Sequence, residues 1–540
     1  MDTDLSLARA SGDAGAGPGL DAGVPPGEPP APHRPVERRS RADSWWARLA
    51  AALAGAALLG LAFPKTGATL LAPIGAVGLF WAWFGASPKR GFFTGWAAGL
   101  VFFAIVFSWI GETAGALIAP FGFLLPLGPA VGDGLFGFAL AGALVAYLDG
   151  RVRPALVPAG AAAAFALSEW FRSEGLGQIG VPFAGLGYTQ VATPLAPLAA
   201  YVGSFGVTFA LCLLPAYLAY ALRHGAAPVA RSAGAACASL VAALALCWWF
   251  WPARFAPPPT TRVAAVQGNI AQTLKFRPEI FSQTLTRYTS LTRSVQRFRP
   301  AFVLWPETVI PASLNRTAWL ETGFGKLSRR LHTTLIAGAF YDSGPQLFNA
   351  LYFFGPSGRL AATYTKRQLV PFAEHLPFAP LLRWIPWSRN VSDIGSGSWN
   401  GLTDAGGVRV GPIICWESAF SNLTVDDVRS GAQALVISTD DAWFGTTGGP
   451  YQHAQIAQMR ALETGRWIVR AAATGISGII APDGRYTKSE PLGRAGVVLG
   501  EIGAPVDTIY DRVGSTGIAA VLAAFILGIG TWGRRSKSAA

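Results

Sequence analysis

Seven long apolar stretches fill the first half of this 540-residue chain, and an eighth lies close to its end. They occupy residues 46–63, 68–86, 91–111, 117–148, 154–172, 194–222 and 233–252, followed by 514–532. Most approach the ~20 residues that a helix needs to cross the hydrocarbon core of a bilayer. The first stretch is marginal, and the fourth is long enough to tilt or break. We therefore predict a polytopic α-helical membrane domain of about eight spans.

The positions of Lys and Arg between these stretches predict their orientation, because short cytoplasmic loops are enriched in both. Arg34, Arg38, Arg39, Arg41 and Arg48 precede or begin the first stretch. Lys89 and Arg90 follow the second stretch, Arg151 and Arg153 the fourth, Arg223 and Arg231 the sixth, and Arg534, Arg535 and Lys537 the eighth. The odd-numbered connections hold Lys65, Glu112 and Glu174. This alternation predicts that both termini are cytoplasmic and that the segment after the seventh stretch lies outside.

Composition excludes several classes of protein. Apolar residues make up 51% of the chain and charged residues only 14%, which is typical of a chain partly dissolved in lipid. The net charge of +13 is not gathered into a Lys/Arg patch with interleaved aromatics, so we expect no nucleic acid as a partner. Cys212, Cys237 and Cys247 lie in apolar runs, and the five His residues lack metal-ligand spacing. We expect neither a metal nor another cofactor.

Residues 253–512 have the alternating pattern of an α/β domain, and they begin near the Pro-rich stretch APPPTT (256–261), which is typical of a domain boundary. Short β-rich runs alternate with amphipathic or polar stretches. These runs are RVAAVQG (262–268), AFVLW (301–305), TTLIAGAF (333–340), VGPIIC (410–415), ALVIS (434–438) and WIVRAA (467–472). The predicted divisions are a disordered cytoplasmic tail at 1–44, a transmembrane domain at 45–252, the α/β domain at 253–512, a last span at 513–533 and a second tail at 534–540.

Three buried-strand patterns stop at a reactive side chain. AFVLW leads to Glu307, LAATYT to Lys366 and VGPIIC to Cys415. Sites form where the strands of α/β sheets end, so a carboxylate, an amine and a thiol could meet there. A thiol attacks an acyl carbon as the thiolate, so it needs a base, and a desolvated carboxylate with a raised pKa can serve. The attack forms a tetrahedral intermediate with an oxyanion, which a fixed ammonium can stabilise. Each residue also has a plainer explanation: a core cysteine, a solvated carboxylate or helix cap, and a surface cation.

The residues around these positions resemble the nitrilase superfamily of carbon–nitrogen hydrolases. The resemblance rests on the chain order Glu, Lys, Cys, and on WPE (305–307), CWE (415–417) and RALETGRWIVRAAATGISGIIAPDGR (460–485). It implies an α-β-β-α sandwich in which Glu307 is the general base, Lys366 stabilises the oxyanion and Cys415 is the nucleophile.

Glu374 and Glu417 are two supporting carboxylates. The resemblance implies that Glu374, which follows Lys366 in KRQLVPFAE, orients the lysine. Glu417 lies just beyond Trp416, so a strand that continued past Cys415 would place both the thiol and this carboxylate on one face. There Glu417 would position the base or the lysine.

Further motifs resemble the apolipoprotein N-acyltransferases, a membrane-embedded family within that superfamily. They are QGNIAQTLKF (267–276), WPETVIP (305–311), KRQLVPFAEHLPF (366–378), CWES (415–418), DAWFGTTGGPYQH (441–453) and EWFRSEGLGQIGVPFAGLGYTQ (169–190). Two aromatic positions depart from the pattern. Phe276 stands in place of Trp and Trp416 in place of Tyr, so any hydrogen bond from an indole or phenol would change there.

The resemblance implies a ping-pong acyl transfer. Cys415 would take an acyl chain from the sn-1 position of a membrane phospholipid as a thioester. It would pass the chain to the α-amine of the N-terminal diacylglyceryl-cysteine of an apolipoprotein, the last step of lipoprotein maturation. The partners would be the phospholipid, the apolipoprotein and the lipid bilayer. The expected location is the bacterial inner membrane, with the catalytic domain on its periplasmic face.

Several residues are candidates for contact with substrate or lipid. Aromatic rings are favoured at the headgroup level, and Trp384, Trp387, Trp443 and Phe276 are the candidates outside the spans. The alternative for the tryptophans is a small core under a long loop.

Two charged positions lie within the predicted spans. Glu169 and Arg172 stand one helical turn apart near the outer end of the fifth stretch, where they could pair or bind a phospholipid headgroup. Asp133 has no evident partner in the sequence, and we expect the fourth stretch to break near Gly132 and Gly134.

Two other functions remain open at this stage. A membrane-tethered amidase or nitrile hydrolase would use water on a small substrate, but it would need no platform of eight spans. A transporter or receptor that only binds ligand would carry charged or broken helices at the bilayer midplane, and only Asp133 hints at one.

Overall fold

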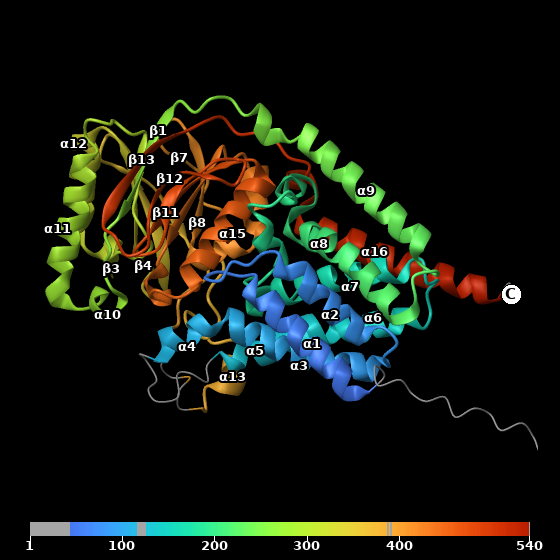
Figure 1. Ribbon diagram of the computed structural model, residues 1–540. Helices are drawn as coiled ribbons and strands as arrows, with labels where there is room; N and C mark the ends of the chain where they lie inside the picture. The colour runs from blue at the N-terminus through green and yellow to red at the C-terminus, as the bar shows by residue number, and fades with distance from the viewer. Residues whose placement is uncertain (1–43, 116–125, 386–387, 389–390, 539–540) are drawn as a thin grey trace, which may run out of the picture.

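The computed structural model describes residues 44–115, 126–385, 388 and 391–538. Within these residues the chain forms a helical half and an α/β half, which lie side by side (Figure 1). The tail predicted at 1–44 lies outside the described residues except for Ser44, and so does Trp387.

The helical half contains a helix in every apolar stretch that the sequence predicts. Its helices are α1 (Trp45–Leu61), α2 (Leu71–Trp83), α3 (Pro88–Val106), α4 (Ser108–Gly115), α5 (Leu127–Asp133), α6 (Leu140–Asp149), α7 (Val157–Trp170), α8 (Ala199–His224), α9 (Ala230–Trp249) and α16 (Tyr510–Ser538). Two π-helical segments, Gly134–Ala139 and Phe171–Gly175, extend α5 and α7, and 3₁₀ turns lie at Gly177–Ile179, Leu186–Gln190, Ala196–Leu198 and Pro252–Phe255.

Among the residues that the structure describes, five helical segments are long and apolar enough to cross a membrane. They are Pro88–Val106, Leu127–Asp149, Ala196–His224, Ala230–Phe255 and Tyr510–Thr531. Helices α1 and α2 are equally apolar but have only 17 and 13 residues. A helical half with candidate membrane spans is therefore confirmed, while the count of eight spans stays a prediction.

Close contacts between glycines hold the first two helices together. A Cβ atom on Gly55 would lie 2.6 Å from the carbonyl oxygen of Gly75, and one on Gly75 would lie 2.5 Å from that of Gly55. Apolar burial does not drive helices together in lipid, so small residues that let backbones approach carry much of the association. Glycine at both positions is what lets α1 and α2 pack this closely.

The predicted break near Gly132 and Gly134 is wrong. The helix continues from α5 through the π-helical segment Gly134–Ala139 into α6. Asp133 also has a partner, because Arg172 Nη1 lies 3.3 Å from its carboxylate. The two residues are 39 positions apart in the chain, so the sequence did not reveal the pair.

The α/β half is built on two sheets. The first has the strand order β13-β1-β2-β4-β5-β6 with β3 beside β4, and the second has the order β12-β11-β10-β9-β8-β7. The strands are β1 (Thr261–Gln267), β2 (Phe302–Leu304), β3 (Ile310–Ser313), β4 (Thr334–Asp342), β5 (Leu347–Phe354), β6 (Leu360–Thr365), β7 (Thr403–Asp404), β8 (Arg409–Ile414), β9 (Ala434–Thr439), β10 (Trp467–Ala472), β11 (Ser477–Ile480), β12 (Tyr486–Glu490) and β13 (Gly496–Ile502). All of the β-rich runs predicted from the sequence are strands.

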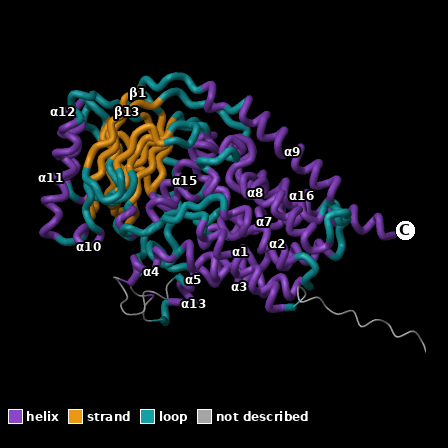
Figure 2. The backbone as a smooth tube through the Cα atoms, in the orientation of Figure 1, coloured by secondary structure: helices purple, strands orange, loops and turns teal. Residues whose placement is uncertain are grey.

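Helices cover both outer faces of the sheets, which gives the predicted α-β-β-α sandwich (Figures 1 and 2). Its helices are α10 (Gln272–Lys275), α11 (Pro278–Ser294), α12 (Ala318–Leu331), α13 (Ala379–Leu382), α14 (Ser421–Arg429) and α15 (Gly449–Thr464), with 3₁₀ turns at Leu314–Arg316, Cys415–Ala419 and Asp441–Phe444. Side chains of α11 and α12 pack on the first sheet, and those of α15 pack on the second.

Strand β1 shows how the sequence places this core. Val263 and Ala265 face the second sheet, whereas Ala264 and Val266 face α11 and α12. Successive side chains of a strand point to opposite faces, so a strand covered on both sides reads as an unbroken apolar run.

A buried polar network joins the two halves. The Glu463 carboxylate in α15 accepts hydrogen bonds from the backbone N–H of Ser204 in α8 and from the Ser421 hydroxyl, both at 2.8 Å. The Ser421 hydroxyl also lies 2.8 Å from the Tyr510 hydroxyl, and the Ser421 N–H donates to Glu174 at 2.9 Å. Helices α14 and α15 are therefore fixed directly to α8 and α16.

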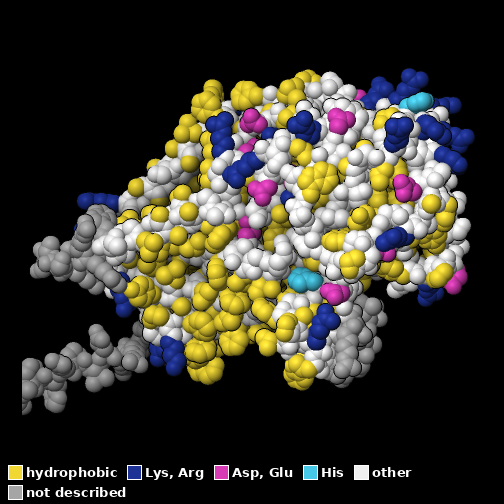
Figure 3. Space-filling view, turned by 180° about the vertical axis from the view of Figure 1, so that it is seen from behind, with side chains coloured by type: hydrophobic (Ala, Val, Ile, Leu, Met, Phe, Trp, Pro, Cys, Tyr) yellow, Lys and Arg dark blue, Asp and Glu magenta, His cyan; other side chains and the backbone are white. Residues whose placement is uncertain are grey.

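The surface reflects this division. Seen from behind, apolar side chains cover a broad area of the helical half, whereas charged side chains are spread over the α/β half (Figure 3).

Candidate active site

The three predicted reactive residues come together in the α/β half. Glu307 follows β2, Lys366 follows β6 and Cys415 follows β8. Lys366 Nζ donates to Glu307 Oε1 at 3.1 Å, and Lys366 and Cys415 are close enough to shift each other's pKa. All three side chains are buried. The arrangement unites a carboxylate, an ammonium and a thiol away from bulk water.

Lys366 is held between two carboxylates. Its ammonium lies 2.9 Å from Glu374 as well as 3.1 Å from Glu307. Burial lowers the pKa of Lys366, but Glu307 and Glu374 outweigh it and raise the pKa above its ordinary value. The lysine is therefore a permanent cation. The contact with Glu374 is the one that the resemblance implies.

Glu307 is fixed by donors on both of its oxygens. Asn349 Nδ2 donates to Oε1 at 2.6 Å, and the Asp440 N–H donates to Oε2 at 2.9 Å. Burial acts to raise the pKa of Glu307, but Lys366 and Lys275 outweigh it and lower the pKa below its ordinary value. The expectation of a base with a raised pKa is therefore wrong, and Glu307 is a carboxylate at neutral pH.

Cys415 sits on a strained turn at the end of β8. Its φ of +51° lies in the left-handed region, which costs a residue with a side chain roughly 1–2 kcal/mol. Burial, and then Glu307, raise the pKa of the Cys415 thiol well above its ordinary value, against the opposing effect of Lys366. The site thus favours a protonated thiol beside a carboxylate.

Glu417 supports this turn in a different way from the one predicted. The strand does not continue past Cys415, because a 3₁₀ turn begins there. The Glu417 carboxylate folds back to accept from the Ile414 N–H at 2.6 Å and the Gln368 N–H at 3.1 Å, and the Arg367 N–H donates to it at 2.5 Å. It therefore ties the backbone before Cys415 to the backbone after Lys366.

Trp416 connects the turn to the helical half. Its ring stacks on Phe183 with centroids 5.0 Å apart and planes 14° from parallel. Its indole nitrogen is buried, and within the described residues it has no hydrogen-bond partner. At this position the chain therefore relies on ring stacking.

The remaining predicted residues are not all at this site. Phe276, Trp384 and Trp443 are exposed on the α/β half. Phe276 follows Lys275, whose ammonium donates to the Glu307 carbonyl oxygen at 3.3 Å.

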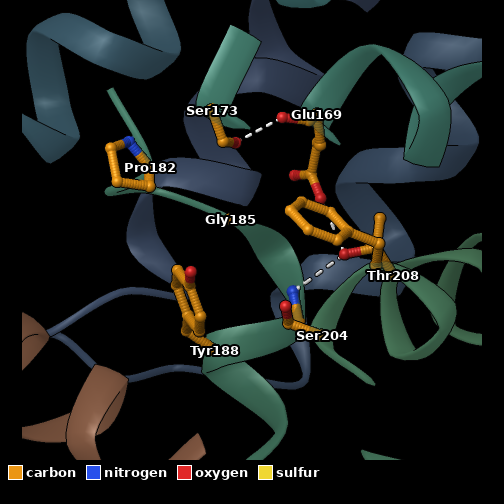
Figure 4. Close-up of a pocket in the computed structure, with 9 residues that line it drawn as sticks. Glu169, Ser173, Pro182, Gly185, Tyr188, Ser204 and Thr208 are labelled. Atoms are coloured by element: carbon orange, nitrogen blue, oxygen red, sulfur yellow. Dashed lines mark hydrogen bonds between the residues drawn. The ribbon is translucent and has the colours of Figure 1, made fainter. Parts of the chain in front are cut away.

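Glu169 and Arg172 are buried in the helical half, and the salt bridge of Arg172 goes to Asp133. Glu169 accepts from the Leu186 N–H at 2.9 Å and from the Thr208 hydroxyl at 2.7 Å. Figure 4 shows Glu169 beside a small pocket that Ser173, Tyr188 and Thr208 also line. None of the residues that line it belongs to the Glu307–Lys366–Cys415 group.

Sequence reasoning missed several residues that support the site. Asn349 lies in β5 and bridges Glu307 and Glu374, to which it donates at 2.6 and 3.2 Å. Lys275 and Asp440 form a buried ion pair beside Glu307. A signal for Asn349 was present, because it is an amide within the apolar run LFNALYFF, and buried polar groups need partners.

The fold and the site define a class of enzyme. Residues 262–506 match the family model described as carbon-nitrogen hydrolase. An amidase from Nesterenkonia sp. is a similar solved structure, with 17% sequence identity and a TM-score of 0.36 over 47% of this chain and 94% of the amidase. The family match identifies the α/β half as a carbon–nitrogen hydrolase domain.

The helical half specifies the family. Residues 55–217 match the model of the apolipoprotein N-acyltransferase N-terminal domain. The apolipoprotein N-acyltransferase of Azotobacter vinelandii is 33% identical over 84% of this chain and 89% of its own length. The relative from Methylococcus capsulatus is 34% identical over 82% of this chain and 87% of its own length. The relative from Shewanella oneidensis is 29% identical over 89% of this chain and 95% of its own length. The chain belongs to the apolipoprotein N-acyltransferase family, and its activity is the N-acylation of lipoproteins.

Proposed function

We propose that Cys415 carries the acyl chain between two lipid substrates, from the sn-1 ester of a membrane phospholipid to the α-amine of a diacylglyceryl-cysteine. The observation that carries this proposal is the buried contact of Lys366 with Glu307 beside the Cys415 turn, in a chain of this family. Within that site Glu307 is the base, Lys366 the oxyanion stabiliser and Cys415 the nucleophile.

The first half-reaction forms the thioester. Glu307 takes the thiol proton as Cys415 Sγ attacks the ester carbon, and the Lys366 ammonium stabilises the oxyanion of the tetrahedral intermediate. The intermediate collapses with loss of the sn-1 alkoxide, which receives the proton from Glu307 and leaves as a lysophospholipid. Asn349 and the Asp440 N–H hold the Glu307 carboxylate in place throughout.

The second half-reaction forms the amide. The neutral α-amine attacks the thioester carbon, Glu307 takes a proton from the attacking nitrogen, and Lys366 again stabilises the oxyanion. The Cys415 thiolate leaves and regains the proton from Glu307. Burial of the site supports this route over hydrolysis, because water would compete with the amine for the thioester.

The proposed setting is the outer face of the bacterial inner membrane. The alternation of Lys and Arg between the spans supports eight spans with both termini cytoplasmic and with residues 253–512 outside. The Glu463 network also supports this setting, because it holds the catalytic half against the helices.

The proposal is tested on the whole purified chain with a phospholipid that carries a labelled sn-1 acyl chain. We expect the label to become attached to the protein in a form that hydroxylamine removes, and a diacylglyceryl peptide with a free α-amine to discharge it as an amide. Release as free fatty acid, with or without the peptide, would favour the water-using hydrolase. Absence of label on the protein and of product would contradict acyl transfer.

The proposed base predicts a flat pH profile. The pKa of Glu307 is below its ordinary value and that of the Cys415 thiol is above its own. A carboxyl with a lowered pKa stays ionised until the pH falls through that lowered value. Single-turnover formation of the thioester should therefore change little between about pH 5 and pH 8. A rise centred near pH 8.5 would instead indicate a free thiolate with an ordinary pKa.

Exposed aromatic and aliphatic side chains near α13 support docking on lipid. Trp384 is 77% exposed and Leu381 is 69% exposed. We expect Trp384→Ser to raise the KM for phospholipid in vesicles by about three- to tenfold, with kcat unchanged, because an interfacial Trp would be lost. Trp319→Ser is the matched control, since Trp319 is also exposed, at 62%, but lies on α12. An equal effect of both changes on KM would argue against docking at Trp384. The double variant Trp384→Ser with Trp387→Ser tests the role of Trp387.

A further inference from the structure

The carbonyl group of Cys415 has its own set of buried partners. The Ser418 hydroxyl donates to Cys415 O at 2.8 Å, and His453 Nε2 lies 3.2 Å from the same oxygen. His453 Nε2 also lies 2.8 Å from Ser418 Oγ. Glu417 holds the backbone on the other side of Cys415, at the Ile414 N–H. The backbone is thus held at the carbonyl of the strained residue and at the N–H of the residue before it.

A chain of buried contacts fixes His453 in turn. Its Nδ1 lies 2.8 Å from Asp441 Oδ1, and Arg470 Nη2 donates to Asp441 Oδ2 at 2.7 Å. The Thr439 hydroxyl donates to Asp441 Oδ1 at 3.0 Å. Burial opposes ionisation of Asp441, but Arg470 and His453 outweigh it and lower its pKa. Because a carboxylate only accepts hydrogen bonds, Nδ1 of His453 carries a proton.

The order Asp441, His453, Ser418 has the connectivity of a catalytic triad, but its position excludes that role. Ser418 is fully buried and its hydroxyl proton goes to Cys415 O or to His453. The serine therefore cannot meet a substrate carbonyl. Ser418 and His453 reach the carbonyl oxygen of the residue that bears the thiol, and Asp441 acts on it through His453.

We propose that Asp441, His453 and Ser418 are positioning residues that lock the Cys415 carbonyl and thereby hold the left-handed turn that presents the thiol. The inference rests on the proposed role of Cys415 as nucleophile. A left-handed residue persists only where its surroundings over-determine it. Without the contacts to its carbonyl, Cys415 can relax toward an ordinary φ, which would swing the thiol away from Glu307 and Lys366.

The first test compares two buried serines in the full chain. Ser418→Ala is expected to lower the single-turnover rate constant of thioester formation about tenfold, with the KM for phospholipid unchanged, because small displacements of a reacting group are costly. Ser328→Ala is the matched control, since its hydroxyl is also buried and lies within reach of the carbonyls of Thr333 and Phe354. A wild-type rate in Ser418→Ala, or an equal loss in Ser328→Ala, would overturn the inference.

The second test separates the two ends of the His453 side chain. His453→Gln keeps an amide nitrogen near the place of Nε2, whereas His453→Asn keeps one near the place of Nδ1. We expect His453→Gln to retain several times the acylation rate of His453→Asn at similar Tm. Equal rates would overturn the inference.

A readout without acyl donor keeps this inference separate from the proposed function. The rate of Cys415 alkylation by iodoacetamide, measured on its own peptide by mass spectrometry, should also fall in Ser418→Ala and stay unchanged in Ser328→Ala. If the wild-type protein forms no thioester, the proposed function fails, while the alkylation rates still decide whether these residues position the thiol.

Discussion

Cys415→Ala is expected to lower hydroxylamine-sensitive labelling by about 10⁴-fold or more, because no other group at the site can form the thioester. Alanine keeps the Cβ atom, so the strain of the left-handed turn is the same in the variant. Loss of label would therefore report the missing sulfur and not a relaxed backbone. Labelling is measured with the sn-1-labelled phospholipid, and a thermal melt verifies that the variant is folded.

The chain supplies a matched control for this experiment. Cys237 is an exposed free cysteine in α9, whereas Cys415 is buried. Cys237→Ala should retain wild-type labelling. Hydroxylamine-sensitive label that survives in Cys415→Ala would place the nucleophile elsewhere.

Lys366→Met is expected to lower the rate of thioester formation by about 10³-fold, within the range measured when an oxyanion-stabilising donor is removed. The substitution keeps an unbranched stem but leaves Glu307 and Glu374 without the cation that now lies between them. Without Lys366, burial raises the pKa of Glu307 relative to the wild type, against the remaining effect of Lys275. The residual rate should therefore rise with pH between about pH 5 and pH 8, where the wild-type rate is flat.

Lys326→Met is the control for removal of a lysine, because Lys326 is exposed on α12. It should keep the wild-type rate and the flat pH profile. Removing one partner of a buried ion pair costs about 3–5 kcal/mol, so stability must be measured beside activity. A folded Lys366→Met variant that acylates within tenfold of wild type would contradict the assigned role.

The sequence predicted the strands and the reactive residues at their ends for one physical reason. Strands such as β1 are buried on both faces, so they appear as short apolar runs, and the residue at which a run stops is visible. Glu307, Lys366 and Cys415 were all predicted in this way, and the structure places Lys366 beside Glu307. The residues that support them were harder to predict from the sequence. Asn349 is a single amide inside an apolar strand, and it reaches Glu307 only because β5 pairs with β4 and β6.

Long-range contacts set the features that the sequence could not predict. The left-handed Cys415 contacts His453, which lies 38 positions further along the chain. The pKa of Glu307 depends on two lysines whose distances become known only in the folded chain. The sequence therefore predicted the residues of the candidate site, but the raised pKa expected for Glu307 is wrong.

The contacts between the halves mean that the catalytic half is not a detachable module. Glu463 and Ser421 complete their hydrogen bonds only with Ser204 and Tyr510 of the helices, and Trp416 completes its packing only with Phe183. A fragment cut at the Pro-rich stretch would contain Glu307, Lys366 and Cys415 yet would expose a buried carboxylate and an aromatic face beside Cys415. Two family models match different parts of the chain, but the contacts between those parts depend on residues from both. A chimera between relatives would therefore have to exchange both sides of these contacts together.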